Sequence, residues 1–367
     1  MTFFPDIRIP EHRDEINTAN TSVLPHHGLL LALWEGGSAF GIDPETLETS
    51  GPIAWSEDVR GQPFSAHPEV EADGTLWNFG VNNDTGQLVI YEIAADGRLR
   101  RAQRIQLPRT PMIQDFAVTQ RHLVFLMPPC NLDIEQVRGG QNFLDSHTWQ
   151  PDQGLLALVI DKSDLARTQR FELPSGFLFH LGGAWDDGGT IRLDCERYPD
   201  PGNLTRFQRG IMSGHANTGN TAELMQLCLN LAAGTAHQDH LAPTSEFPTL
   251  HPDFTGQRYR YRYSLTCTND LGHPFYNALR RFDLERGIDE QVSFGRYRGA
   301  EEHIVAPKPE ARDEAAVWLL GTVLDLEAER MHLTVLDGEA FADGVVFEAA
   351  LPYVLPIGFH GSFQPAS

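Results

Sequence analysis

The chain has 367 residues, of which 41% are apolar and 10% aromatic, so it can bury a substantial core as one large domain or two ordinary ones. Its formal charge of −22, which no basic stripe offsets, argues against nucleic acid and anionic membrane surfaces as partners. No window approaches the ~18 apolar residues of a membrane-spanning helix, and residues 1–16 lack the apolar region of a signal peptide. We therefore expect a soluble, cytoplasmic protein.

Short apolar or alternating runs, separated by Gly, Pro and Asp-Gly pairs, dominate the chain and predict an all-β fold. Asp-Gly pairs favour tight hairpin turns because glycine adopts positive φ at little cost, and they begin at Asp73, Asp96, Asp187, Asp337 and Asp343. The strands that we expect between such turns include Leu76–Val81, Gln87–Glu92, His122–Leu126, Met225–Leu231 and Met331–Leu336.

Only two segments, Asp133–Arg138 and Asp313–Ala316, have the character of a helical turn. Many short strands with frequent turn signals predict a sandwich, a barrel or a propeller, and this pattern alone does not separate the three. No low-complexity linker divides the chain, so we expect one domain. The four cysteines lack paired spacing of the CxxC type, which indicates reduced thiols, mostly buried.

Three of the fifteen histidines differ from the others in their surroundings: His67 in FSAHPEV, His180 in GFLFHLGG and His360 in IGFHGSF. Each lies close to a phenylalanine and small residues at an expected strand end. Residues so far apart in sequence can share one metal ion only if a closed fold brings them together, and imidazole suits iron, copper and zinc alike. The chain has no GxSxG, P-loop, GxGxxG or HExxH motif, so no motif indicates a serine hydrolase, a nucleotide-binding protein or a zincin.

From Asn17 onward the sequence resembles the carotenoid cleavage oxygenase family. The resemblance is carried, in order, by NTANTSVLPHHGLLLALWEGG, FSAHPEV, PMIQDFAVTQRHLVF, FHLGGAWDDGG, SEFPTLHPDF with QRYRYRY, and LPIGFHGSF. It implies a seven-bladed β-propeller with a non-haem Fe(II) ion on its axis, held by one histidine from each of four blades. We expect residues 17–367 to form one such domain, incomplete because the family's N-terminal strands are lacking, and residues 1–16 to be a non-matching segment.

By this resemblance His67, His180 and His360 match the first, third and fourth iron ligands. The second falls on Gln114, in a QDF run that relatives write HDF, so the expected site is a three-histidine site, a site with Gln114 as a weaker neutral ligand, or an empty one. The resemblance also implies that Glu35, Glu246 and Glu302 accept the outer imidazole N–H groups and fix the tautomer of each ring.

The implied activity is cleavage of a C=C double bond of a carotenoid, apocarotenoid or related conjugated polyene with O₂, giving carbonyl products. The alternative is a degenerate member that binds an apolar ligand without turnover. Oligomeric state and a peripheral membrane contact stay open. The stilbene-cleaving branch is similar but has a lysine where this chain has Trp34, which favours an apolar substrate. The aromatic residues that we expect along a substrate tunnel are Trp34, Phe64, Phe116, Phe179 and Phe359.

Overall fold

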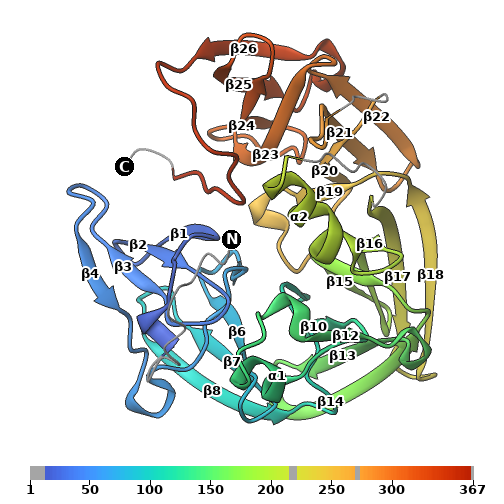
Figure 1. Cartoon of the computed structure of the whole chain (residues 1–367). Coiled ribbons are helices and arrows are strands. Elements are labelled where there is room, and N and C mark those ends of the chain that lie inside the picture. Colours follow the sequence, from blue (N-terminus) through green and yellow to red (C-terminus); the bar gives the residue numbers. More distant parts are fainter. Residues whose placement is uncertain (1–12, 215–220, 269–272, 365–367) are drawn as a thin grey trace.

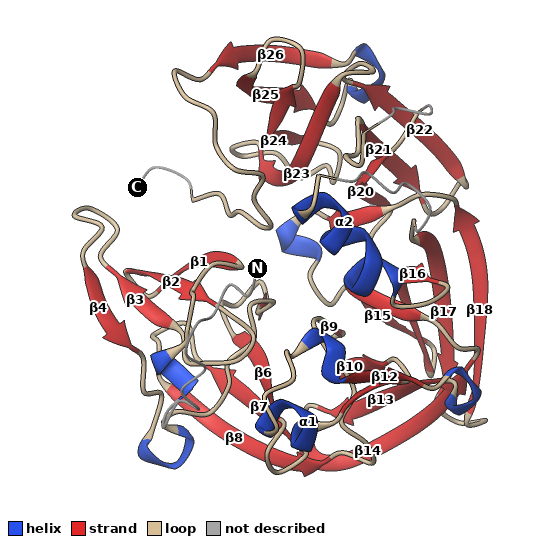
Figure 2. Ribbon diagram, in the orientation of Figure 1, coloured by secondary structure: helices blue, strands red, loops and turns tan. Residues whose placement is uncertain are grey.

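The computed structural model describes residues 13–214, 221–268 and 273–364, and these form an all-β propeller (Figures 1 and 2). They contain six four-stranded sheets, where the family resemblance implies seven, so the expected blade count is corrected. The reason is that the strands of the described residues, β1 to β26, form these six sheets and one small two-stranded sheet. Figure 1 shows the sheets arranged around a common centre, with an opening in the ring between the first sheet and the sixth.

The first three sheets are antiparallel, and their strands follow one another in the chain, except that a connection within the third forms a small sheet of its own. The first consists of β1 (Ser22–His26), β2 (Leu29–Leu33), β3 (Phe40–Ile42) and β4 (Thr49–Pro52). The second consists of β5 (Glu69–Val70), β6 (Leu76–Asn82), β7 (Gln87–Ile93) and β8 (Leu99–Gln106). The third consists of β9 (Phe116–Val118), β10 (His122–Met127), β13 (Leu155–Asp161) and β14 (Asp164–Leu173).

The other three sheets have the same simple order. The fourth consists of β15 (Phe177–Asp187), β16 (Thr190–Tyr198), β17 (Glu223–Asn230) and β18 (Thr235–Ala242). The fifth consists of β19 (Glu246–Thr249), β20 (Tyr261–Thr266), β21 (Ala278–Asp283) and β22 (Ile288–Ser293). The sixth consists of β23 (Arg298–Pro307), β24 (Val317–Asp325), β25 (Arg330–Asp337) and β26 (Val345–Ala350).

The remaining elements are short and lie in the connections. A two-stranded sheet of β11 (Cys130–Leu132) and β12 (His147–Trp149) flanks the helix α1 (Ile134–Arg138). Between β16 and β17 a π-helical turn (Asn203–Phe207) runs into α2 (Gln208–Met212). The 3₁₀ turns are Arg13–Glu15, Glu57–Val59, Leu144–Ser146, Pro151–Gln153, Pro252–Phe254 and Phe341–Asp343. Within the described residues, no helix is both long enough and apolar enough to cross a membrane.

The strands expected from the sequence are confirmed as β6, β7, β10, β17 and β25, with bounds within about two residues. The first helical segment is confirmed as α1, where the Asp133 carboxylate accepts backbone N–H groups as an N-cap. The second segment, Asp313–Ala316, which has the character of a helical turn, forms a single turn and no helix, closed by the Ala316 N–H donating to the Asp313 carbonyl. All four cysteines are free thiols, two of them buried.

Apolar clusters fill the spaces between neighbouring sheets and hold the propeller together. Leu31 and Tyr91 join the first and second sheets, Phe79 and Phe125 the second and third. Other clusters join the third sheet to the fourth and the fifth to the sixth. Among the described residues, no cluster joins the sixth sheet to the first, in agreement with the opening in Figure 1.

The fourth and fifth sheets are joined differently, by buried charges. The apolar cluster between them is small, with Leu224, Ala242 and Phe282 as its buried members. Beside it, Arg262 of β20 reaches across to β16, where its Nε lies 2.8 Å from the Asp194 carboxylate and its Nη2 bonds Glu196. All three side chains are about 1% exposed or less, and burial raises the pKa of Asp194 to about 7.

We expect Arg262→Ala to lower the free energy of unfolding by about 3–5 kcal/mol, because it leaves two carboxylates buried without their cation. Equilibrium unfolding in urea measures this loss. Arg167→Ala is the matched control, since Arg167 pairs with Asp161 at the surface and its side chain is 78% exposed. Equal losses in the two variants would show that the buried cluster does not join the sheets.

Candidate metal centre

His67 lies in the connection that leads into β5, at the inner end of the second sheet. Its backbone N–H donates to the Ser65 hydroxyl at 3.0 Å, and the Ser65 carbonyl in turn accepts from the Asn78 side chain on β6. These bonds fix the short stretch from Phe64 to His67 against the sheet. The imidazole therefore projects from a backbone that is itself held in place.

His180 lies within β15, the innermost strand of the fourth sheet, where the pairing with β16 is irregular on both sides of Leu181. The two glycines that follow allow this close packing. A Cβ atom on Gly182 would lie 2.1 Å from the Asp194 carboxylate, and one on Gly183 would lie 2.3 Å from the Tyr259 ring. The FHLGG run thus contains a candidate metal ligand, His180, and two glycines that leave room for the neighbouring side chains.

His360 comes from a different kind of element. Residues 352–364 lie outside helices and strands, and they lead from β26 back toward the centre of the ring (Figure 1). The backbone N–H of Gly361 donates to Glu302 on β23 at 2.9 Å. His360 is therefore attached to the propeller mainly through the side chains around it.

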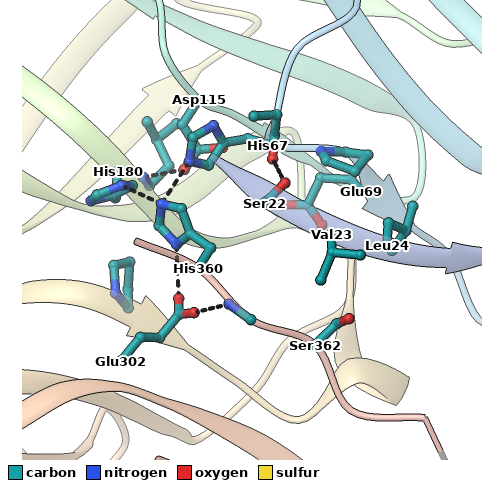
Figure 3. A pocket seen from close by; sticks show the side chains of 15 residues that line it. Ser22, Val23, Leu24, His67, Glu69, Asp115, His180, Glu302, His360 and Ser362 are labelled. Carbon is teal, nitrogen blue, oxygen red and sulfur yellow. Dashed lines mark hydrogen bonds and ion pairs between the residues drawn. The ribbon is translucent and has the colours of Figure 1, made fainter. Parts of the chain in front are cut away.

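The structure brings these three histidines together, as Figure 3 shows. The Nε2 atom of His360 lies 3.1 Å from Nε2 of His67 and 3.2 Å from Nε2 of His180. A metal ion about 2.1 Å from each nitrogen, with ligands at right angles, would place neighbouring nitrogens about 3.0 Å apart. The three nitrogens thus fit one metal ion, and His67, His180 and His360 are the residues that would hold it.

A different glutamate lies behind each ring. Nδ1 of His67 is 3.2 Å from Glu35, that of His180 is 2.5 Å from Glu246, and that of His360 is 3.0 Å from Glu302 (distances to a carboxylate oxygen). An Nδ1–H that faces a carboxylate leaves the Nε2 lone pair directed at the cavity, which is the tautomer a metal ion needs. Glu35 is 35% exposed and its pair with His67 lacks hydrogen-bond geometry, so this is the loosest of the three.

The Glu246 carboxylate has the most complete surroundings. One oxygen accepts the Tyr198 hydroxyl at 2.8 Å, and the other accepts the backbone N–H of Phe247 at 2.8 Å as well as the His180 ring. Burial raises the pKa of Glu246 to about 7, although these donors oppose the shift. The carboxylate is consequently fixed in orientation, and it fixes the His180 ring with it.

Charge differs between the ligands. Burial lowers the pKa of His180 well below its ordinary value, and the nearby His360 and His67 rings lower it further, so His180 is neutral. Burial would also lower the pKa of His67, but the Glu35 carboxylate, with weaker contributions from Asp115 and Glu302, raises it to about 9. Without a metal ion, His67 is therefore protonated near neutral pH.

Gln114, the residue at the fourth ligand position, precedes β9 and is half-buried. The cavity around the histidines is lined by its neighbour Asp115 rather than by Gln114 itself. The Asp115 oxygens accept the backbone N–H groups of Phe116 and Leu181, each at 2.7 Å, which ties the third sheet to the strand that carries His180. Ligation by Gln114 stays a prediction, and Asp115 has a structural role that the sequence analysis missed.

The cavity has a mixed lining. Its apolar side chains are Val23, Leu24, Ala66, Pro68, Leu181 and Pro248, and its polar ones, besides the histidines, include Ser22, Glu69, Asp115, Glu302 and Ser362 (Figure 3). The five aromatic residues expected along a tunnel are absent from this lining in the part of the chain that the structure describes. Phe64, Phe116 and Phe179 are buried in apolar clusters, Trp34 is half-buried beside Phe64, and Phe359 is exposed.

Two aromatic rings lie against the histidines. The centroid of the Phe179 ring is 6.2 Å from that of His180, and Phe247 lies closer. Its ring centroid is 5.0 Å from that of His180 and 5.3 Å from that of His360. Its φ of 52° is unusual for a bulky residue, and it follows Glu246 at an irregularity in the pairing of β19. The SEFP run was noted in the sequence only for its glutamate, because a pattern of residue types does not reveal a left-handed backbone.

Comparison with known proteins gives a consistent result. The family described as "Retinal pigment epithelial membrane protein" matches residues 4–365. The apocarotenoid-15,15'-oxygenase of Synechocystis is 27% identical over 365 residues, which cover 95% of this chain and 73% of that protein. The isoeugenol monooxygenase of Pseudomonas putida is 26% identical over 379 residues, which cover 94% of this chain and 75% of that protein.

Solved structures extend the likeness to three dimensions. The cobalt-substituted apocarotenoid oxygenase of Synechocystis superposes with a TM-score of 0.86 at 26% identity, covering 95% of this chain and 75% of that one. The lignostilbene dioxygenase of Pseudomonas brassicacearum superposes with a TM-score of 0.83 at 28% identity, covering 94% and 75%.

We expect metal affinity to rise with pH up to about pH 9. Because the pKa of His67 is raised to about 9, a metal ion must displace its proton at lower pH, which costs about tenfold in affinity per pH unit. Calorimetric titration of the metal-free protein with Co²⁺, in buffers of different ionisation enthalpy, measures both the affinity and the proton released. Glu35→Gln should shift the rise to lower pH. A flat affinity between pH 7 and pH 9 would contradict the assignment of this proton to His67.

Proposed function

The chain belongs to the retinal pigment epithelial membrane protein family, and from this premise we propose that it is a non-haem Fe(II) dioxygenase. Its relatives include carotenoid-cleaving oxygenases. The proposed reaction cleaves a C=C double bond of a carotenoid, apocarotenoid or related conjugated polyene. One O₂ molecule is consumed, and each carbon of the broken double bond receives one oxygen atom as a carbonyl.

The observation that carries this proposal is the arrangement of the three imidazole rings, each with Nε2 toward a common point and Nδ1 against its own glutamate. A merely structural histidine cluster gains nothing from directing three ring nitrogens at one another. The donor set contains no thiolate, and imidazole is compatible with iron as well as with other transition metals. The relatives' oxygenase names favour iron among these.

When bound, ferrous iron would supply the activation of O₂. The side chains of this protein would do the rest. His67, His180 and His360 hold the metal, and Glu35, Glu246 and Glu302 keep each Nδ1–H in place. Phe247 packs against two of the rings and restricts their rotation. The apolar part of the lining, Val23, Leu24, Ala66, Pro68, Leu181 and Pro248, would orient an apolar substrate and keep water from the reacting bond.

The second candidate function is apolar-ligand binding without turnover, and one residue favours it. Gln114 stands where the resemblance places an imidazole, and an amide oxygen is a weaker neutral ligand. Three imidazoles remain, from the second sheet, the fourth sheet and the segment after β26, and three is the ligand count of many catalytic metal sites. For this reason we prefer the enzyme, and the two functions differ in a measurable way.

We expect the anaerobically purified protein, supplied with Fe²⁺ and then with O₂, to convert an apocarotenoid to a shorter aldehyde detectable by liquid chromatography and mass spectrometry. A stilbene and a propenylphenol should be assayed in parallel to define the substrate class. His180→Ala should lower turnover by at least about 100-fold, because loss of an outer partner alone costs about 10–100-fold. Bound iron with an apolar ligand but no cleavage of any of these compounds would favour the non-catalytic function.

We expect Gln114→His to raise Fe²⁺ affinity by about tenfold or more, since imidazole replaces an amide at the fourth position. The matched control is Gln120→His, which makes the same substitution at an exposed turn in the same sheet. Affinity is measured anaerobically with a competing chelator. No difference between the two variants would show that the fourth position is not directed at the metal in this protein.

A further inference from the structure

Two adjacent glutamates on β23 project toward the segment that carries His360. In a regular strand, consecutive side chains point to opposite faces. Here the pairing of β23 with β24 shifts between Ala300 and His303, so that Glu301 and Glu302 together oppose the single residue Thr322. This is a β-bulge, in which an extra residue redirects its side chain. As a result, both carboxylates face the segment of residues 352–364.

His303 and Gly321 hold the bulge in this shape. The buried His303 ring contacts the Glu301 carbonyl through Nδ1 at 2.8 Å and the Thr334 hydroxyl through Nε2 at 2.9 Å. Opposite it, a Cβ atom on Gly321 would lie 2.5 Å from the His303 ring and 2.7 Å from the Glu302 carbonyl. Burial lowers the pKa of His303 to about 4, so the ring is neutral. The bulge is therefore a packed feature and not a frayed strand.

The Glu301 carboxylate connects this bulge to the ligand segment. Its Oε1 accepts the backbone N–H of Gly358 at 3.2 Å, and its Oε2 accepts the Thr322 hydroxyl. The neighbouring Glu302 accepts the N–H of Gly361 and the His360 ring. One carboxylate thus holds the backbone before His360 and the other holds the backbone after it.

Little else holds this segment within the described residues. The hydrogen-bonded backbone N–H groups of residues 352–364 are those of Gly358 and Gly361, and both donate to these two carboxylates. The large side chains nearby, among them Tyr353, Leu355 and Phe359, are exposed and bury little apolar surface. A ligand on such a segment is placed only as well as its attachments allow, because backbone without packing or paired hydrogen bonds is mobile.

We propose that Glu301 is a positioning residue for the metal centre, which acts by clamping the backbone at Gly358 so that His360 reaches the other two histidines. This rests on the proposed metal-dependent function. It goes beyond it because Glu301 touches neither the metal position nor any ligand ring. A hydrogen bond to a charged acceptor is stronger than a neutral one, so the loss of this carboxylate frees the backbone two residues before the ligand.

Glu301→Ala tests the proposal, with Co²⁺ as the probe. We expect it to lower Co²⁺ affinity about tenfold, in the range of other outer partners of metal ligands, and to change the visible absorption bands of the bound Co²⁺. Glu301→Gln should keep most of the affinity, because its amide oxygen can still accept from Gly358, as a weaker neutral acceptor, while its NH₂ group donates to Thr322. Glu327→Ala removes an exposed carboxylate from the turn after β24 and controls for the change in net charge.

Hydrogen exchange of the metal-free protein, followed by mass spectrometry, provides a second readout. Peptides that contain Gly358 should exchange about tenfold faster in Glu301→Ala than in Glu301→Gln or Glu327→Ala, whereas peptides of β13 should not change. If metal binding fails in every variant, the proposed function is contradicted while this readout still decides the role of Glu301. The proposal is overturned if Glu301→Ala matches Glu327→Ala, or if Glu301→Gln is impaired as strongly as Glu301→Ala.

Discussion

The candidate metal centre depends on the contact between an imidazole Nδ1 and a carboxylate, repeated three times. Each contact selects one tautomer, which leaves the Nε2 lone pair directed at the common point, and each lies between different sheets or segments. Glu246 of β19 faces His180 of β15, and Glu302 of β23 faces His360. Because ligand and carboxylate come from different parts of the ring, the packing of the sheets sets the geometry of the site. The cluster of Arg262, Asp194 and Glu196 joins two of these sheets, so it affects the geometry of the site without contacting the histidines.

Histidine spacing and local composition were enough to single out His67, His180 and His360, and the family resemblance supplied their glutamates. Their meeting point could be anticipated because the motifs are specific in combination. The number of sheets could not be anticipated, because strands with alternating residues look alike whether they form a ring of six sheets or of seven. Strand existence was predictable for β17, where alternation is regular, whereas the Asp-Glu-Ala-Ala run of residues 313–316 suits a helical turn and a non-helical turn equally well.

Two of the three residues that sequence reasoning missed depend on irregular backbone. Phe247 reaches two ligand rings because its φ is positive, and Glu301 faces the same side as Glu302 because β23 bulges. Asp115 was part of a recognised motif, but attention fell on Gln114 beside it, and only the contact with the Leu181 N–H reveals what the aspartate does. Residue types and periods describe regular strands well. They carry no information about where a strand departs from its own geometry.

The origin of the three ligands has a consequence for how the protein matures. His67 and His360 are 293 residues apart, so the last of the three histidines reaches the cavity only after the sixth sheet, which precedes it in the chain, has been synthesised. A metal ion bound at this point closes a very long loop, and its binding free energy is added to the stability of a ring that is open on one side. A bound metal ion would thus link the second sheet to the segment that follows the sixth, beside the opening in the ring.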